Sequence, residues 1–509
     1  MIVDHAPSDA AIRSILIVGG GTAGWMSAAI LSRFLDPNRC SITLVESEEI
    51  GIVGVGEATV PLMQHFNGVL GIDENAFVAA TSGSFKLGIE FRDWGRVGNV
   101  HFHGFGDYGD SIEGVSPHHH WLKLHQLGDP SPIDDYSFPY AMGRQGRFAP
   151  PQQDKQNPAA FFRYAFHFDA ALYARYLRGL CEARGVKRVE GRVVASRLDG
   201  DSGNIASLQL ADGRDIAADF FVDCSGFSGL LIEQALRTGY EEWSHWLPCD
   251  RAVVIPTERS GPPPPFTVST AQAAGWQWRI PLQHRDGNGH VYASGFVDDD
   301  AARRTLLDAV IGTPLADTRV LRFVTGHRRK FWNRNCVAIG LAGGFMEPLE
   351  STSIQLIQTA IARLIEFFPD RNFDPVMIDE YNRITTNEFE RIRDFLILHY
   401  CPSQRDEALW QYCRSMPIPD SLAHKIEVWK SCGRVPLLTE ESYQEPSWVA
   451  VLLGNGIVPH RYDPIVDRIA LDRLRGGLAA RRRAISDAVQ RLPSHEAYIQ
   501  RFCAAREAA

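Results

Sequence analysis

The sequence has no C-x-x-C pair, and its nine cysteines are scattered along the chain. This spacing offers neither a disulfide framework nor a redox pair, so we expect reduced thiols in a reducing compartment. No apolar run is long enough to cross a bilayer, and the first residues lack a basic segment followed by an apolar one. We therefore expect a cytoplasmic protein without membrane contact.

A metal-ligand pattern is also missing. His118-His119-His120 is the densest histidine cluster, but no nearby cysteine or acidic pattern completes a site. We therefore expect no metal, and we expect these histidines in a turn at the surface or at the rim of a pocket.

Positive charge is not in excess either. The net charge is −9, which argues against binding to nucleic acid or to an acidic membrane. The one basic run, Arg473 to Arg483, indicates a solvated helix face. A chain of 509 residues without internal repeats or low-complexity segments has room for two or three domains.

The first pattern that is present predicts a dinucleotide site. The apolar run Ser14 to Val18 leads directly into Gly19-Gly20-Gly21-Thr22-Ala23-Gly24, and a helical pattern follows. This is G-x-G-x-x-G between a strand and a helix, where the glycines let the backbone approach a pyrophosphate. A second strand, Ser41 to Val45, ends in Glu46, where this fold places an acid on the ribose.

Two further segments predict a site beyond the nucleotide. The glycine-rich stretch Gly51 to Pro61 indicates a close-fitting loop that can move, although an ordinary turn has similar residues. Lys86 follows between apolar residues. Most lysines face solvent; a buried one needs a partner, and its lowered pKa would suit a nucleophile or proton donor.

The chain is organised around the stretch Gly344 to Ile354. It joins a buried strand to a helical pattern of isoleucines and leucines, and Ser351, Thr352 and Ser353 are candidate N-caps. The start of a helix presents free N–H groups that hold an anion. Glu350 stands beside that site, either as a plain stabiliser of the helix start or as a functional carboxylate.

Five separated motifs together resemble the flavin-dependent tryptophan halogenase family, from about residue 14 to at least residue 465. They are Gly19 to Gly24, Gly54 to Pro61, Ser84 to Ile89, Trp276 to Pro281 and Glu347 to Ile354. W-x-W-x-I-P and P-L-E-S-T are the most specific of them.

The resemblance implies an α/β fold. We expect the Rossmann-type FAD-binding domain of the aromatic-hydroxylase-like flavoproteins, with a substrate sheet and a C-terminal helical region. Residues 1–370 would form the FAD-binding and substrate-sheet core from discontinuous segments. Residues 371–509 would form a mainly helical region that covers the substrate pocket.

The resemblance also implies the chemistry. In the family, reduced FAD and O2 oxidise a halide, and the hypohalous acid travels through a tunnel to a lysine that passes the halogen to an electron-rich aromatic ring. Lys86 matches that lysine. Glu350 matches the catalytic glutamate, which stabilises the cationic ring intermediate or takes its proton.

The remaining site residues are carried over from the family. The expected FAD-binding residues are Gly19, Gly21, Thr22, Ala23, Gly24, Glu46, Ser47, Glu57, Val194, Leu341 and Ile354, of which Glu57 belongs to the loop that couples the flavin and substrate sites. The expected halide site consists of Thr352 and Ser353. The expected substrate pocket consists of Ile89, His103, Phe105 and Trp448. Trp276 and Trp278, on the same side of one strand, would keep the substrate from the flavin.

Two departures from the family pattern bear on specificity. Ser353 stands where well-studied tryptophan halogenases have glycine, so its side chain could reshape the halide site and favour bromide over chloride. The segment Glu441 to Trp448 retains Tyr443 and Trp448 but lacks the tyrosine pair that clamps the amino and carboxylate groups of tryptophan. We therefore expect indole, an indole derivative or a larger aromatic to be a better substrate than free tryptophan.

Two other functions were weighed. An FAD-dependent aromatic monooxygenase shares the fold, but it usually has a Gly-Asp motif after the last buried strand, where this chain reads Gly340-Leu341-Ala342-Gly343-Gly344. A non-catalytic flavin-binding protein would not need to retain Lys86 and Glu350. Because no nicotinamide-binding pattern is visible, we expect a separate flavin reductase to supply diffusing FADH2. A homodimer is expected from the family alone.

Overall fold

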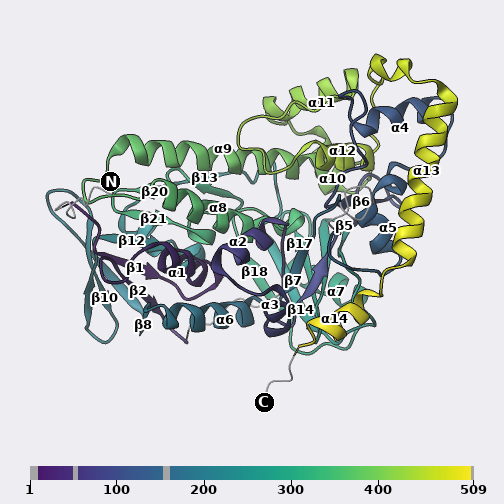
Figure 1. Cartoon of the computed structure of the whole chain (residues 1–509). Coiled ribbons are helices and arrows are strands. Elements are labelled where there is room, and N and C mark those ends of the chain that lie inside the picture. The colour runs from purple at the N-terminus through teal and green to yellow at the C-terminus, as the bar shows by residue number, and fades with distance from the viewer. Residues whose placement is uncertain (1–9, 50–55, 153–160, 506–509) are drawn as a thin grey trace, which may run out of the picture.

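The computed structural model describes residues 10–49, 56–152 and 161–505. A six-stranded sheet with the order β20-β21-β12-β1-β2-β8 forms one end of the molecule (Figure 1). Its strands are β1 (Ser14–Val18), β2 (Ser41–Glu46), β8 (Lys187–Glu190), β12 (Phe220–Asp223), β20 (Trp332–Asn333) and β21 (Cys336–Ala338). All of its neighbouring pairs are parallel except β20 and β21. This is the predicted Rossmann-type sheet, confirmed here.

The central strand β1 is buried along most of its length because helices cover it. α1 (Thr22–Phe34) follows β1 directly and packs on α6 (Ala170–Ala183) and α8 (Ser353–Glu366). The segments that build this unit therefore come from the two ends of the core region.

A seven-stranded sheet lies beside the nucleotide unit, in the order β18-β14-β17-β16-β15-β5-β6. Its strands are β5 (Gly88–Arg92), β6 (Val100–Gly104), β14 (Arg251–Thr257), β15 (Thr267–Gln272), β16 (Gly275–Pro281), β17 (Asp286–Tyr292) and β18 (Arg319–Arg322). Only β15 and β5 are parallel. β16 places both tryptophans of the W-x-W motif in the interior.

Three small sheets connect these units. Their strands are β3 (Glu57–Ala58), β7 (Ala165–Phe168) and β4 (Ser84–Lys86); β13 (Tyr240–Glu242), β19 (Gly326–Arg328) and β22 (Gly344–Phe345); and β9 (Val193–Leu198), β10 (Ile205–Leu210) and β11 (Asp215–Ala217). The first sheet brings Glu57 and Lys86 onto strands that flank β7. Residues 51–55 of the predicted mobile loop lie outside the described residues.

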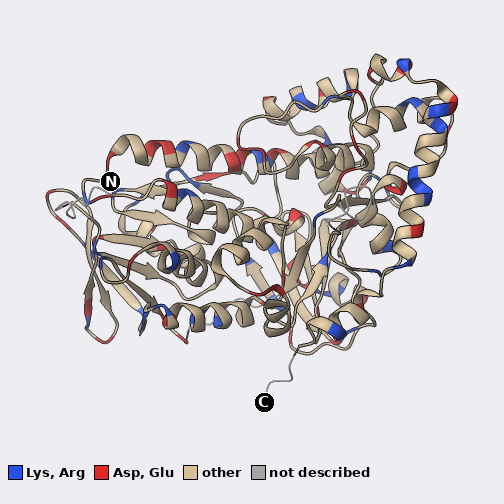
Figure 2. Cartoon of the chain, viewed as in Figure 1, with Lys and Arg blue, Asp and Glu red and all other residues tan. Residues whose placement is uncertain are grey.

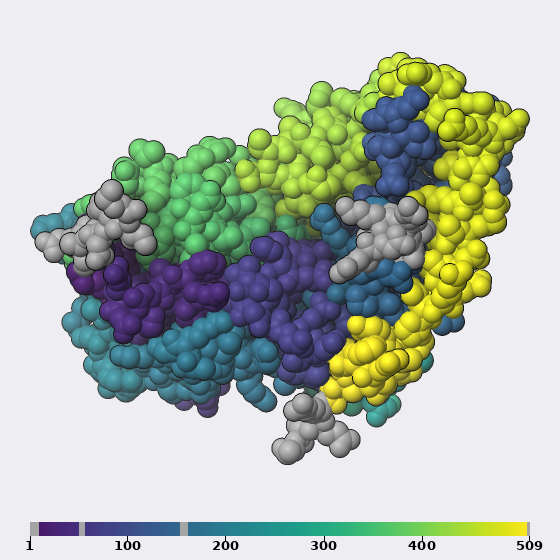
Figure 3. Space-filling model, viewed as in Figure 1, coloured from purple at the N-terminus to yellow at the C-terminus, as the bar shows by residue number. Residues whose placement is uncertain are grey.

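Helices dominate after residue 370. They are α9 (Pro375–Tyr400), α10 (Ala408–Ser415), α11 (Asp420–Cys432), α12 (Glu445–Gly454), α13 (Leu471–Gln490) and α14 (His495–Phe502). α9 runs from above the nucleotide sheet to the group formed by α10, α11 and α12 (Figure 1). The last two helices form one edge of the molecule, against the earlier segment near residue 120 (Figure 3). No helix in the described ranges is long and apolar enough to span a membrane.

The remaining helices are α2 (Leu62–Leu70), α3 (Glu74–Ala80), α4 (Pro117–Gln126), α5 (Phe138–Arg144) and α7 (Asp299–Ala309). Figure 2 shows basic residues distributed along α13. This basic run is only partly a solvated face. Arg473 and Arg483 are exposed, but Arg481 donates to the carbonyl of Tyr136 and Arg482 pairs with Asp135.

The prediction for His118, His119 and His120 was wrong. They lie on α4 and all three are buried, because other segments enclose the helix. His118 Nε2 is 2.8 Å from the carbonyl oxygen of Gly433, and His119 Nδ1 accepts from the backbone of Asp463. Burial lowers the pKa of His119 to about 3, so its imidazole is neutral. No group of three or more potential ligands in the described ranges is arranged to hold a metal ion.

Candidate active site

The turn after β1 needs its glycines. Gly19 has a φ of +113°, and a Cβ there would lie 2.2 Å from the carbonyl oxygen of Cys224. A Cβ on Gly24 would lie 1.8 Å from the carbonyl oxygen of Gly19, whereas one on Gly21 would meet nothing within 4 Å. The turn is therefore packed against β12 on one side and open on the other, which suits a pyrophosphate at the start of α1.

Other predicted FAD contacts lie around this turn. Glu46 ends β2, and a Cβ on Gly20 would touch its carboxylate. A Cβ on Gly340 would lie 2.8 Å from that of Ala23, so the turn that carries Leu341 adjoins α1. Ser47 follows Glu46 and is half-buried. Val194 lies on β9 with 53% of its surface exposed.

Glu46 already has a protein partner. Arg188 on β8 donates to its carboxylate and also reaches Glu48 and Glu190. The guanidinium fixes the carboxylate beside the turn, where it could accept from ribose hydroxyls.

Lys86 lies at the centre of the molecule. Its side chain is completely buried, and Nζ donates to the carbonyl of Thr59 at 3.0 Å and to the hydroxyl of Ser351 at 2.8 Å. Burial lowers the pKa of Lys86 to about 7, although the charge of Glu350 opposes the shift. The amine therefore exists in both protonation states near neutral pH, as a halogen-carrying or proton-donating lysine requires.

The start of α8 supplies an anion site. Ser351 has a φ of +63°, and this left-handed residue turns the chain from the short helix Pro348–Glu350 into α8. Thr352 occupies the N-cap position without capping, and its buried Oγ1 has no partner among the described residues. Ser353 begins the helix. The free N–H groups of the first turn and the unpartnered hydroxyl suit a halide.

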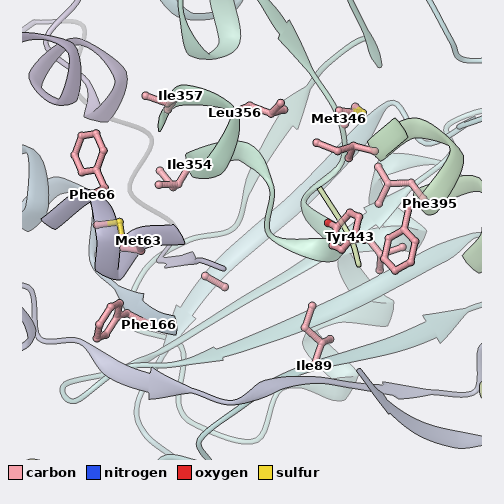
Figure 4. Packing of buried hydrophobic residues seen from close by; sticks show 14 of the residues in the cluster. Met63, Phe66, Ile89, Phe166, Met346, Ile354, Leu356, Ile357, Phe395 and Tyr443 are labelled. Atoms are coloured by element: carbon pink, nitrogen blue, oxygen red, sulfur yellow. The ribbon is translucent and has the colours of Figure 1, made fainter. Parts of the chain in front are cut away.

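Figure 4 shows the apolar packing beneath this turn. Ile354 and Ile357 of α8 point toward Met63 and Phe66 of α2. All four are buried, so the first turn of α8 is held against the nucleotide unit. This packing explains why the isoleucine spacing in the sequence predicted the helix.

Glu350 is held by two imidazoles. His103 Nδ1 lies 2.9 and 3.1 Å from its two carboxylate oxygens, and His399 Nε2 lies 2.9 Å from Oε1. Burial alone would raise the pKa of Glu350, but the charges and hydrogen bonds of the two histidines outweigh burial and lower it to about 2. Glu350 is therefore a buried carboxylate anion next to Lys86.

Glu347, three residues earlier, has the opposite environment. Its Oε2 accepts from Trp276 Nε1 at 2.7 Å and from the Tyr400 hydroxyl at 2.6 Å, whereas the buried Oε1 has no partner among the described residues. Burial raises the pKa of Glu347 to about 7, and the two donors reduce the shift. Glu347 joins the W-x-W strand and α9 to the P-L-E-S-T turn.

Aromatic rings surround His103. Phe105, Phe395 and Tyr443 have ring centroids 6.2, 5.7 and 6.0 Å from that of His103. Tyr443 stacks on Phe395 at 3.9 Å, and both lie above Ile89 in Figure 4. Phe105 also lies 5.3 Å from Lys86 Nζ. The predicted pocket residues Ile89, His103 and Phe105 therefore lie together, next to Lys86.

Trp448 also packs against this aromatic group. Its ring is 4.9 Å from that of Phe395 and lies under Lys425, which pairs with the buried Glu441. This lysine is thus neutralised by a neighbour within the protein.

The tryptophan pair and Glu57 lie on two different strands, β16 and β3. The rings of Trp276 and Trp278 lie 5.9 Å apart, so the two share one side of β16 as predicted. Burial and the charge of Asp169 raise the pKa of Glu57 to about 7. Glu57 begins the strand that leads to Thr59, the carbonyl partner of Lys86.

Sequence reasoning missed three residues of the site. Glu347, His399 and Tyr400 were not singled out, although Glu347 belongs to a quoted motif. A second glutamate directly before the P-L-E-S-T motif was a usable signal. His399 and Tyr400 lie near the end of a helix whose pattern is ordinary, so nothing in the sequence marked them.

Comparison with known proteins gives consistent matches. The sequence model of the family described as Tryptophan halogenase matches residues 14–471. Tryptophan 6-halogenase SttH of Streptomyces toxytricini is 37% identical over 522 residues, which cover 95% of this chain and 97% of that protein.

Two solved structures are similar over nearly the whole chain. Xcc4156, a flavin-dependent halogenase from Xanthomonas campestris, has a TM-score of 0.95 and 45% identity, covering 98% of this chain and 100% of that one. BrvH, a flavin-dependent halogenase from Brevundimonas sp. BAL3, has a TM-score of 0.94 and 43% identity, covering 97% and 100%.

Proposed function

This chain belongs to the flavin-dependent tryptophan halogenase family, and from that premise we propose that it halogenates an electron-rich, indolic ring through hypohalous acid and Lys86. FAD and a halide are the cofactors that membership of this family implies. We also propose that the reaction depends on O2, because reduced FAD supplies the electrons that activate oxygen.

The observation that carries this proposal is the pairing of Lys86 with the P-L-E-S-T turn. Its amine is buried, is held at a fixed point by Thr59 and Ser351, and has a pKa near 7. A buried amine confines a reactive halogen to one place, whereas free hypohalous acid reacts with many groups. Glu350 lies close enough to stabilise positive charge on a ring beside Lys86 or to take its proton.

The chain has residues that fit FAD. The open side of the Gly19–Gly24 turn and the carboxylate of Glu46 would hold the nucleotide half, and Leu341 and Ile354 would contact the ring system. Thr352 and Ser353 would hold the halide at the start of α8. Trp276 and Trp278 would separate the flavin from the substrate, which disfavours hydroxylation.

The finer points of specificity rest on two residues and one segment. Ser353 adds a hydroxymethyl group at the halide site, so we propose that bromide is preferred over chloride. Lys425 already neutralises Glu441 in the segment that would bind the amino-acid groups of tryptophan. This pairing supports indole or an indole derivative as the better substrate.

Mass spectrometry of reaction products tests the proposal. The protein is incubated with FAD, a flavin reductase and NADH, with indole or tryptophan, in chloride or bromide buffer. We expect haloindole in larger amount than halotryptophan, and more bromination than chlorination at matched halide. Hydroxylated indole would contradict the proposal, and equal rates for the two halides or the two substrates would contradict the corresponding preference.

A pair of lysine variants controls for folding. Lys86→Met should abolish the halogenated product while FAD still binds. Lys123→Met removes another buried lysine, which contacts Val466 and Asp467 on a different part of the molecule, and should retain the product. Equal losses in both variants would count against the role of Lys86. The cytoplasmic location, the separate reductase, the homodimer and the division at residue 370 stay predictions.

A further inference from the structure

Glu350 and His103 form a dyad whose free atom belongs to the histidine. An ionised carboxylate can only accept hydrogen bonds, so the ring nitrogen of His103 that faces Glu350, Nδ1, carries the proton. In the neutral imidazole the other nitrogen, Nε2, then has a free lone pair. Nε2 is buried and has no hydrogen-bond partner among the described residues.

Both oxygens of the same carboxylate already face imidazole nitrogens. One of its oxygens lies 2.9 Å from His103 Nδ1, and the other lies 2.9 Å from His399 Nε2. Although burial raises the pKa of Glu350, its contacts with the two histidines outweigh burial and lower it, so the carboxylate is a weak base as well. It resembles the carboxylate of a hydrolase triad, which orients an imidazole and stabilises its cation without becoming protonated.

The surroundings distinguish the two imidazoles. His103 lies among Phe105, Phe395 and Tyr443, the rings of the substrate pocket, and Phe105 is also next to the Lys86 amine. His399 also lies next to Phe395, at 5.5 Å, but it stacks on Phe91 at 4.6 Å and lies 5.8 Å from Trp94. His399 therefore shares Phe395 with His103 and otherwise packs on core rings.

Other groups near the pocket are occupied or unsuited. Lys86 Nζ donates to Thr59 and Ser351, and it has no lone pair until it has given its proton to the leaving group. Burial and the charge of Glu350 raise the pKa of the Tyr443 hydroxyl well above its usual value, but a phenol that keeps its proton is a poor base.

We propose that Nε2 of His103, rather than an oxygen of Glu350, accepts the proton that the substrate ring loses on halogenation. This inference rests on the proposed function and deepens it by naming the catalytic base. Glu350 acts through His103 as the group that holds its tautomer and stabilises its cation.

The ring carbon forms a bond to the halogen as the O–X bond of the hypohalous acid breaks, and the leaving hydroxide takes a proton from the Lys86 ammonium to give water. The C–H bond then breaks, its electron pair restores the aromatic ring, and its proton passes to Nε2. Transfer of one proton from the imidazolium to the Lys86 amine restores both groups.

A deuterium isotope effect tests the inference. Indole and perdeuterated indole are brominated by wild type and by His103→Asn, whose amide nitrogen replaces Nδ1 as a donor to Glu350 but leaves no group in place of Nε2. Wild type should show no primary isotope effect, because loss of the ring proton is fast. In the variant, turnover should fall by about 10²-fold, and a primary isotope effect should appear as proton loss becomes slow.

His399→Gln is the matched control. Its amide can replace Nε2 in the contact with Glu350, so turnover should fall much less than in His103→Asn and no isotope effect should appear. If His103→Asn does not fold, His103→Gln serves instead, since its amide reaches the Nε2 position but is not basic. The same isotope effect is expected.

The outcomes separate the two claims. Absence of haloindole from wild type would overturn the proposed function. Active wild type, together with a His103 variant that is as fast, or slow without an isotope effect, would overturn the role of His103 and leave the halogenase function standing. FAD binding by absorbance and bromination of a diffusible phenol report that the earlier steps are intact.

Discussion

Glu347 and Glu350 lie three residues apart, and both are completely buried, yet their environments drive their pKa values in opposite directions. Glu347 receives a tryptophan N–H and a tyrosine O–H, which are neutral donors that only partly offset burial. Glu350 is next to two imidazoles, which can also carry positive charge. The type of donor, rather than burial, therefore decides which of the two carboxylates stays ionised.

The different protonation states suit the two glutamates to different roles. An acid that is half protonated near neutral pH suits a structural link, because its neutral form costs little to bury. A carboxylate that stays ionised can instead stabilise positive charge on a ring or an imidazole. Three ways of testing this division follow, in order of decreasing effect.

The largest effect should come from neutralising each acid in turn. Glu350→Gln removes the charge beside Lys86 and His103 and should lower the rate of haloindole formation by about 10²- to 10³-fold, the usual loss for one electrostatic group. Glu347→Gln keeps an acceptor for Trp276 and Tyr400 and should lower the rate less than about 10-fold. Product formation by mass spectrometry measures both. A larger loss in Glu347→Gln would reverse the proposed roles.

The next effect concerns the pH dependence of stability. Because the pKa of Glu347 rises to about 7 in the folded protein, the folded state binds more protons than the unfolded state between about pH 4.5 and 7. The contribution of Glu347 to stability is therefore full below that window and is lost as pH rises through it. Glu347→Gln should gain on the order of 2 kcal/mol relative to wild type between pH 5 and 8.

Urea unfolding of both proteins at several pH values measures this gain. Glu350 should behave in the opposite sense, since its pKa is lowered to about 2 and its stabilisation is lost as pH falls below about 4.5. A constant difference between wild type and Glu347→Gln over the whole range would show that Glu347 does not titrate there.

The smallest effect compares two buried tyrosines. Tyr400→Phe removes a hydroxyl that donates to Glu347, whereas Tyr381→Phe removes one that donates to the backbone carbonyl of Ala360. At pH 8, where Glu347 is ionised, we expect Tyr400→Phe to cost about 1 kcal/mol more, because hydrogen bonds to charged groups are stronger. The excess should shrink at pH 5. Equal costs at both pH values would mean that Glu347 carries no charge.

The sequence predicted the parts of the molecule that depend on local pattern. The strand, glycine turn and helix at Ser14 to Phe34 formed as expected, and so did the helix that starts at Ser353, because glycine chemistry and apolar spacing act over a few residues. The hydroxyl caps were not used as expected, since the Ser351 hydroxyl accepts from Lys86 Nζ and the Thr352 Oγ1 has no partner among the described residues.

The side-chain partners could not be predicted in the same way. His103 and His399 come from β6 and α9, distant in sequence from Glu350, and only tertiary packing brings them within 3 Å. The prediction for His118 to His120 is wrong for the converse reason: a run of polar residues favours a surface turn, but neighbouring segments and carbonyl groups enclose these three side chains. Histidine is a poor indicator of exposure because it can satisfy a buried contact in its neutral form.

The two acids also have neighbouring partners on one helix. His399 and Tyr400 are consecutive residues at the end of α9, and the first contacts Glu350 whereas the second contacts Glu347. Consecutive positions on a helix face directions about 100° apart, so a small rotation of α9 moves both contacts at once. Directed evolution that reshapes the pocket through α9 will therefore change the pH range of stability together with the turnover. Libraries built on β6 and on Tyr443, which lies outside α9, leave the sequence of this helix unchanged.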